Sequence, residues 1–457
     1  MTPLPPSAAP GAALRWADHL RATLRLGWPL VLSLIVGMLL GVTDTVMMGW
    51  YGVAELAAVA LGASSFFTVF ILGGGFGIAV MGVVAAARAR GDDDQVRRAT
   101  RMAIWLAVIF AALVLPVFWF SAPILRALGQ SPEVAGLAQD YLRILGFGMF
   151  AQQIQMVLRS YLAALERTAI LLWVTLAGLI CNATLNWLLI FGHAGFPEMG
   201  VRGSALATVI TQLLIVTVQA LYAGWLPEAR RYRLFHRLWR PDASALREVF
   251  RLGWPIGLTG LSESGLFQAS ALMMGWIGTH ELAAHGIALQ ITSLTFMVHV
   301  GLSNAATVRV GRAYGAGDAQ GLRDAALAAM ALSLAMVIAT AVVFLTVPAP
   351  IVGLFLDRDN PAAAQIIAIG SGLLFMSALF QLFDAMQCLA LGLLRGVQDT
   401  RVPMWLAGIS YWLIGIPASY VLAFTLDFGP KGLWLGLVIG LAAAGVLLMG
   451  RFWRGRV

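Results

Sequence analysis

Long apolar stretches, broken by short polar segments, run along almost the whole chain. Each is long enough to cross a bilayer as a helix, which takes about 20 residues. We count twelve such spans, at approximately 26–48, 56–86, 102–121, 137–158, 169–191, 203–226, 252–277, 282–308, 325–347, 366–392, 402–424 and 431–450. The pattern therefore predicts an all-α polytopic membrane protein with twelve transmembrane helices.

The first two spans recur in the second half of the chain without a gap. The segment Arg25–Asp92 matches Arg251–Asp318, with each matching residue of the second copy 226 positions after its counterpart. Such self-similarity indicates a duplicated structural unit. Because an even number of spans separates the copies, the halves should lie parallel, related by an axis along the membrane normal, with a cleft between them. We expect two pseudo-symmetric six-helix bundles.

Basic residues set the orientation of these bundles. Of the 30 lysines and arginines, all but five fall on one side of the predicted membrane, the exceptions being Arg126, Arg143, Arg202, Arg358 and Lys431. Excess positive charge marks the cytoplasmic side, so both termini should be cytoplasmic. We expect bundles at 26–226 and 252–450, a cytoplasmic linker at 227–251, and cytoplasmic tails at 1–25 and 451–457.

The composition supports a membrane protein and excludes several enzyme classes. Residues are 60% hydrophobic and 11% charged, whereas soluble domains carry about 25% charged residues. The net charge of +8 is read as a topology signal, not as a sign of nucleic-acid binding. No phosphate-binding loop surrounds the single lysine, and the glycine run Gly73–Gly77 favours helix packing over nucleotide binding. We expect neither enzymatic activity nor a cofactor.

Three carboxylates lie well inside the apolar spans: Asp44, Glu263 and Asp384. Each costs about 2.5–3.5 kcal/mol at the bilayer centre on insertion scales. Arginines that could neutralise them are scarce at that depth, so we expect no cationic partner. A buried carboxylate without one carries a proton or binds a cation. The alternative for each is a protonated acid that hydrogen-bonds a neighbouring helix.

Polar and aromatic side chains near these acids are candidates for lining a substrate cavity. In the tenth span, Gln381, Asp384 and Gln387 share one helical stripe. Gln152 stands opposite Asp384 when the fourth and tenth spans are aligned. The full set of cavity candidates is Gln152, Asn182, Asn186, Gln381, Gln387, Phe267, Phe380 and Met297. For any one of the apolar members, ordinary packing is the alternative.

At these residues the sequence resembles the multidrug and toxic compound extrusion (MATE) transporters, in their NorM-like branch. The resemblance runs from about residue 26 to the end of the twelfth span. It is carried by Gly41-Val-Thr-Asp-Thr-Val-Met-Met-Gly, Gly253-Trp-Pro-Ile with Glu263, Val308-Arg-Val-Gly-Arg-Ala-Tyr-Gly-Ala-Gly-Asp, and Gly392-Leu-Leu-Arg-Gly-Val-Gln-Asp-Thr-Arg-Val-Pro.

The resemblance implies a secondary antiporter of the bacterial inner membrane that exports bulky, often cationic drugs and dyes in exchange for H⁺ or Na⁺. It assigns the cation site to Glu263 and Asp384, with further roles for Asp44 and Asn182. Phe380 stands where sodium-coupled relatives often have a tyrosine, which favours protons. Small-molecule drugs, the coupling cation and membrane lipid are the expected partners, and we expect a monomer.

Two other functions remain open at this point. A lipid-linked oligosaccharide flippase of the same superfamily would handle an anionic pyrophosphate, for which we would expect arginines or lysines in the cleft. An intramembrane protease would need two facing aspartates on adjacent helices, whereas Asp44 and Asp384 lie in different halves. The acids in the spans favour the antiporter.

Overall fold

The computed structural model describes residues 16–236, 238–356 and 361–456. The first fifteen residues of the expected N-terminal tail, Arg237, Arg358 and Val457 lie outside this part of the chain. Throughout the described residues the secondary structure is helical, without strands.

Within the described residues, twelve long helical segments occupy the places of the twelve predicted spans. The first half holds α1 (Trp16–Tyr51), α2 (Val53–Arg90), α3 (Asp93–Trp119), α5 (Pro132–Ala164), α6 (Ala169–Phe191) and α7 (Gly200–Trp225). The second holds α9 (Ala243–Ile277), α10 (Thr279–Ala316), α11 (Ala319–Thr346), α13 (Ala363–Gly396), the segment 401–425 that begins with α14 (Arg401–Ile409), and α16 (Gly429–Arg456). Shorter helices are α4 (Ser121–Ala127), α8 (Pro227–Arg230) and α12 (Pro348–Gly353).

Ten of these segments are long and apolar enough to cross a membrane, among the residues described. The other two, α5 and α9, are equally long but more polar, since α5 carries Gln152 and Gln153 and α9 carries Glu263. The structure thus confirms the predicted all-α polytopic architecture.

The duplication is visible in matching helix ends. Gly91 and Gly317, at equivalent positions of the two copies, end α2 and α10 with φ of 72° and 68°, a left-handed conformation that glycine adopts without steric cost. The next residues, Asp92 and Asp318, then begin α3 and α11 by accepting backbone N–H bonds of 2.9 and 2.8 Å. The same sequence signal folds identically in both halves.

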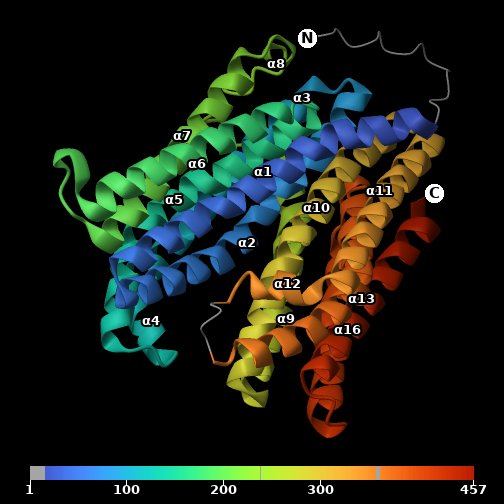
Figure 1. Cartoon of the computed structure of the whole chain (residues 1–457). Coiled ribbons are helices and arrows are strands. Elements are labelled where there is room, and N and C mark those ends of the chain that lie inside the picture. The colour runs from blue at the N-terminus through green and yellow to red at the C-terminus, as the bar shows by residue number, and fades with distance from the viewer. Residues whose placement is uncertain (1–15, 237, 357–360, 457) are drawn as a thin grey trace.

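The two halves lie side by side at one end of the molecule and diverge at the other (Figure 1). We call the joined region the seam; it comprises the second halves of α2 and α10 and the first parts of α1 and α9. At the seam, a Cβ on Gly75 of α2 would lie 2.3 Å from the Gly253 carbonyl oxygen and 2.4 Å from the Gly257 nitrogen of α9. Only glycine allows this backbone approach. The glycine run of α2 is therefore a helix-packing feature, as predicted.

The seam has approximate two-fold symmetry. Gly301 of α10 is the counterpart of Gly75 in the second copy, and its hypothetical Cβ would lie 2.4 Å from a methyl group of Val31 on α1. Val31 in turn is the counterpart of Gly257 in the first copy. One helix contact is therefore made twice, with the roles of the halves exchanged.

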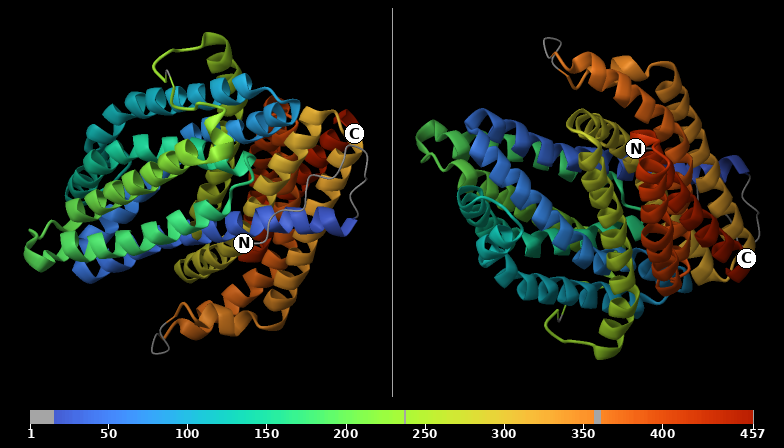
Figure 2. Two further views of the ribbon diagram at one scale, coloured as in Figure 1. Left: turned by 90° about the horizontal axis from the view of Figure 1, so that it is seen from above. Right: turned by 90° about the horizontal axis from the view of Figure 1, so that it is seen from below.

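Two helices begin earlier than the apolar pattern indicates. α1 starts at Trp16, inside the expected tail, and α9 starts at Ala243, inside the expected linker. We call residues 16–25 and 242–251 the arms, because each reaches onto the other half: α1 packs against α10 and α11, and α9 against α3. Figure 2 shows the start of α1 running beside the second half. At the other end of the chain, α16 continues to Arg456.

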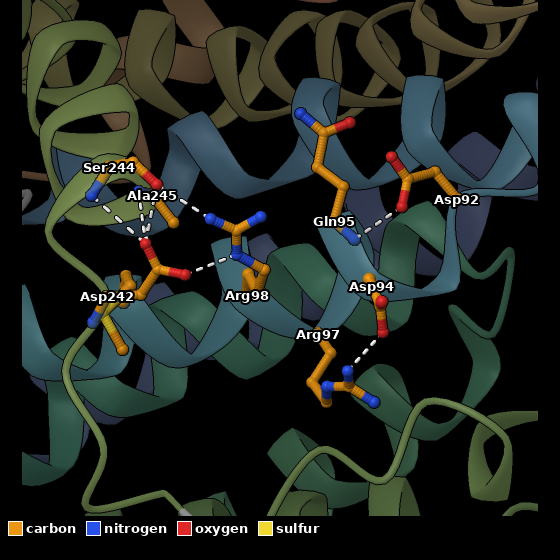
Figure 3. Close-up of polar contacts among 9 residues, drawn as sticks. Asp92, Asp94, Gln95, Arg97, Arg98, Asp242, Ser244 and Ala245 are labelled. Carbon is orange, nitrogen blue, oxygen red and sulfur yellow. Dashed lines mark hydrogen bonds and ion pairs between the residues drawn. The ribbon is translucent and has the colours of Figure 1, made fainter.

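Arginines hold both arms. Arg309 of α10 donates to the His19 carbonyl at 2.8 Å and to the Thr23 hydroxyl at 2.5 Å. Arg98 of α3 bonds Asp242 at 2.5 Å and Ser244 at 2.8 Å (Figure 3). The polar arms are thus part of the contact between the halves.

Candidate acidic site

Glu263 and Asp384 meet in the second half through one side chain. The amide nitrogen of Gln387 donates to a Glu263 oxygen at 2.6 Å and lies 3.4 Å from an Asp384 oxygen. Asp384 and Gln387 are three residues apart on α13, so they share a face, and α9 brings Glu263 to them. Asp384 is 3% exposed, whereas Glu263 is half-buried. Two carboxyl groups therefore share one neutral donor.

Tyr411 fixes the orientation of that amide. Its hydroxyl donates to the Gln387 oxygen at 2.5 Å, which leaves the amide nitrogen to face the carboxyl groups. Tyr411 is fully buried and lies in a π-helical stretch, Ser410–Gly415, that follows α14. Wider helical turns of this kind often occur at functional sites. A phenolic oxygen thus reaches the acid pair indirectly.

One cation lies closer to the pair than expected. Arg395, near the end of α13, interacts electrostatically with Glu263. The sequence pattern placed Arg395 among the loop arginines, but α13 continues to Gly396 and keeps this side chain half-buried. Arg395 acts on Glu263 at long range, and among the described residues no ion pair is found between an arginine and Glu263, Asp384 or Asp44.

Asp44 forms a separate site in the first half. Its two oxygens accept hydrogen bonds from the Asn186 amide at 2.6 Å and the Thr208 hydroxyl at 3.0 Å. Asn186 also donates to Asn182 at 3.2 Å, and the side chains of Asp44 and both asparagines are buried. The donors come from α6 and α7 and are uncharged. Asp44 therefore resides among neutral hydrogen-bond donors, apart from the Glu263–Asp384 pair.

The remaining cavity candidates are dispersed. Gln381 is buried and bonded to Thr340 of α11 at 2.8 Å and to Thr295 of α10, so it links helices of the second half. The Phe380 ring is 1% exposed and packs edge-on against Phe267 and Trp434, with centroids 6.1 and 5.4 Å away. Two candidates, Met297 of α10 and Gln152 of α5, are half-buried. Of the eight cavity candidates, only Gln387 bonds the acid pair, and only Asn182 and Asn186 belong to the hydrogen-bonded group around Asp44.

Sequence reasoning missed Thr208 and Tyr411. Both are polar side chains within apolar spans, which is the signal that selected Asn182 and Asn186.

The side chains gathered at the two acidic sites offer mainly oxygen atoms, which suit protons or hard cations. Among the described residues, no group of three or more His, Cys, Asp or Glu side chains could hold a metal ion.

Comparison with known proteins identifies the family of the chain. The family model MatE matches residues 29–188 and 255–421. The chain belongs to the MatE family. Both matched segments begin in the first helix of a half, so the MatE match follows the duplication seen in the fold.

Similar MatE proteins cover almost the whole chain. A "Probable multidrug resistance protein NorM" of Rhizobium meliloti (strain 1021) is 45% identical over 439 residues, covering 96% of this chain and 94% of the relative. A protein with the same description from Agrobacterium fabrum is 43% identical, covering 97% and 95%. Membership of MatE places the chain among transporters rather than enzymes.

Solved structures share the fold. "Crystal structure of eukaryotic MATE transporter AtDTX14" superposes with a TM-score of 0.84 at 21% identity, covering 95% of both chains. "Crystal structure of MATE in complex with MaL6" gives 0.85 at 21% identity, covering 97% of this chain and 99% of the other. The twelve helices in two bundles are the architecture of MATE transporters.

Proposed function

We propose that this MatE-family chain is a secondary active multidrug efflux antiporter of the bacterial inner membrane, with both termini in the cytoplasm. It exports bulky, often cationic organic compounds in exchange for protons or sodium. The names of its relatives support multidrug export. The arginines concentrated at the seam end support the orientation, because positive charge favours the cytoplasmic side.

The observation that carries the proposal is the pair Glu263 and Asp384 on one Gln387 amide. Two neighbouring carboxylates repel each other when both are ionised, so a proton or a bound cation between them relieves that repulsion. Gln387 supplies one neutral donor to two acids, which leaves room for a positively charged partner. The pair is thus suited to take up one coupling cation and release it again.

We infer that the pair lies just beyond the seam along α9. Glu263 follows the seam residues Gly253 and Gly257 along α9, towards the diverging end. With the seam on the cytoplasmic side, this conformation faces outward, and a cation from outside reaches the pair. Binding of the cation then favours one of the two states, outward-facing or inward-facing, and release of the cation favours the other. The drug crosses during the same change of the bundles, which couples the flow of drug to the flow of the cation.

Asp44 provides a second acidic site in this scheme. Its neutral donors Asn186 and Thr208 hold the carboxylate in place without compensating its charge. We propose that Asp44 binds either a proton or the positively charged group of a substrate. Protons are the preferred coupling ion, because the Tyr411 hydroxyl bonds Gln387 and not the acids. No cofactor is required, and the monomer is the working unit.

The test is dye movement in liposomes that contain the purified protein. A fluorescent cationic dye inside the liposomes is driven by a pH gradient alone or by a sodium gradient alone. We expect movement with the pH gradient; movement with sodium alone would keep antiport but change the ion. Movement with neither would overturn the proposal and favour the lipid-linked oligosaccharide flippase.

A further inference from the structure

A pocket of about 330 Å³ lies over the seam, at its arginine-rich end. Its walls come from the ends of α2, α5 and α10, the turn after α5 and the linker between the halves. The charged side chains lining it are Arg88, Arg231, Arg312 and Glu166, and its other walls are alanines and a valine. Three positive groups face one negative group in a space that both halves enclose.

The three arginines of the pocket have different partners. Arg312 of α10 bonds Glu166 across the seam at 3.0 Å. Arg231 lies 3.5 Å from an Asp93 oxygen and also bonds the Tyr232 hydroxyl. Arg88 reaches a neutral group, the Ala164 carbonyl, at 3.4 Å. Arg309, one helical turn before Arg312, adds a further charge that interacts with both Arg312 and Glu166.

The joined seam brings like charges together. Arg88 belongs to the first half and Arg312 to the second, and both line the same pocket. A phosphate bound between these two arginines would contact both halves at once. Guanidinium groups form short, paired hydrogen bonds with phosphate oxygens, and basic pockets between helices on the cytoplasmic side bind lipid phosphates.

We propose that this pocket binds a phosphate group, either free or in the head group of an anionic lipid. An anion that touches both halves binds more tightly when the seam is joined, so it stabilises the joined state. Stabilisation of the joined state rests on the alternation between two states that is proposed above, whereas phosphate binding does not. The phosphate site is separate from the acids Glu263 and Asp384.

The first experiment measures binding to the purified full-length protein at constant ionic strength. The probes are inorganic phosphate and short-chain phosphatidic acid, with short-chain phosphatidylcholine as the comparison without net charge. Binding of inorganic phosphate identifies a soluble source as sufficient. Binding of phosphatidic acid alone assigns the site to lipid. Binding of neither probe overturns the proposal.

Variants then locate the site. Arg88→Gln and Arg312→Gln each remove one charge-assisted contact, and we expect the dissociation constant to rise about tenfold or more. Arg323→Gln removes the same charge from an exposed position of α11 at the same end of the molecule, and we expect no change. Equal weakening by all three would mean nonspecific attraction and would overturn the proposal.

A fourth variant separates binding from stability. Glu166→Gln breaks the same bridge as Arg312→Gln but keeps all three arginines and removes the competing carboxylate. We expect it to bind phosphate more tightly than the unaltered protein. If Glu166→Gln weakened binding as much as Arg312→Gln, loss of the bridge would be the cause, and the phosphate site would be wrong. Dye transport enters none of these readouts.

Discussion

Asp324 occupies the same place in the second repeat as Arg98 in the first, yet carries the opposite charge. Each faces the arm of the other half. Arg98 bonds Asp242 at 2.5 Å, and Asp324 lies 4.0 Å from the ring nitrogen of His19. The duplicated helices keep the arm contact while exchanging acid and base. Each arm therefore carries a side chain that suits the helix it contacts, and neither arm suits the helix that the other arm contacts.

Asp242 offers a test of the arm contact through acid dependence. Hydrogen bonds from Arg98 and from the start of α9 hold the pKa of its carboxyl well below the usual 3.8. Because the folded pKa is lowered, the contribution to stability is complete above the unfolded value and is lost as the pH falls below it. We expect the difference in unfolding midpoint between the protein and Asp242→Asn to stay constant at neutral pH and to shrink below about pH 4.

Two substitutions divide the roles of Asp242. Asp242→Asn keeps a cap for Ser244 and Ala245 but loses the ion pair, which is worth about 0–1 kcal/mol at a partly exposed site. Asp242→Ala also loses the cap, which costs about 1 kcal/mol more. Thermal unfolding in detergent should rank the alanine variant lower. Equal midpoints for both variants would contradict the capping contacts.

The seam is tested by two adjacent glycines of α2. Gly75→Ala places a methyl group against the α9 backbone, and overpacking of this kind costs about 1–3 kcal/mol. We expect a lower unfolding midpoint, weaker dye export and greater access of a thiol reagent to cysteines placed at the seam. Gly74→Ala is the control, because nothing lies within 4 Å of its hypothetical Cβ. Similar behaviour of the two variants would mean that the seam is not packed as described.

The Tyr411 hydroxyl is expected to act through Gln387. Tyr411→Phe leaves the buried Gln387 oxygen without its donor, at a cost of about 1–3 kcal/mol. The amide is then free to turn away from the acids, so we expect slower gradient-driven export with unchanged dye binding. Tyr420→Phe, at an exposed position of the same helical segment, should retain full activity. Loss of dye binding in Tyr411→Phe would place Tyr411 in the substrate site instead.

Removal of a hydrogen-bond donor to Asp44 should slow export. Thr208→Val removes the hydroxyl that bonds one Asp44 oxygen, and loss of a hydrogen bond worth about 0.5–1.5 kcal/mol predicts up to about tenfold slower export. Asp44→Asn should abolish export. Thr184→Val is the control, since the Thr184 hydroxyl bonds only its own helix at Ile180. Normal export by Asp44→Asn would remove Asp44 from the mechanism.

The sequence predicted the helices well because membrane helices follow from apolar length. All twelve spans are present, and the spacing of the duplication recurs in the capping residues Asp92 and Asp318. The arms were missed because they are polar, and hydropathy does not mark a helix stabilised by contacts such as Arg309 with Thr23. Local pattern describes a single helix, whereas the arms depend on helices from the other half.

The site was predicted less completely for the same reason. Asp384 and Gln387 share a face at helical spacing, so their proximity follows from the sequence. The contact of Gln387 with Glu263 depends on how α9 packs against α13, and Tyr411 reaches Gln387 from a π-helical turn that alters the helical register. The arginine near Glu263 was missed because α13 extends further than its apolar stretch. The sequence shows which residue types are present, but it does not show which helices pack against each other.

The most direct test of the account compares two modes of transport in Glu263→Gln and Asp384→Asn. Liposomes containing each variant are assayed for dye export driven by a pH or sodium gradient, and for dye-for-dye exchange without a gradient. Glu133→Gln, which changes an exposed carboxylate at the start of α5, is the control. The account predicts that both variants lose gradient-driven export and keep exchange, while the control keeps both. Normal gradient-driven export by Glu263→Gln and Asp384→Asn would contradict the central claim that this pair couples ion and drug.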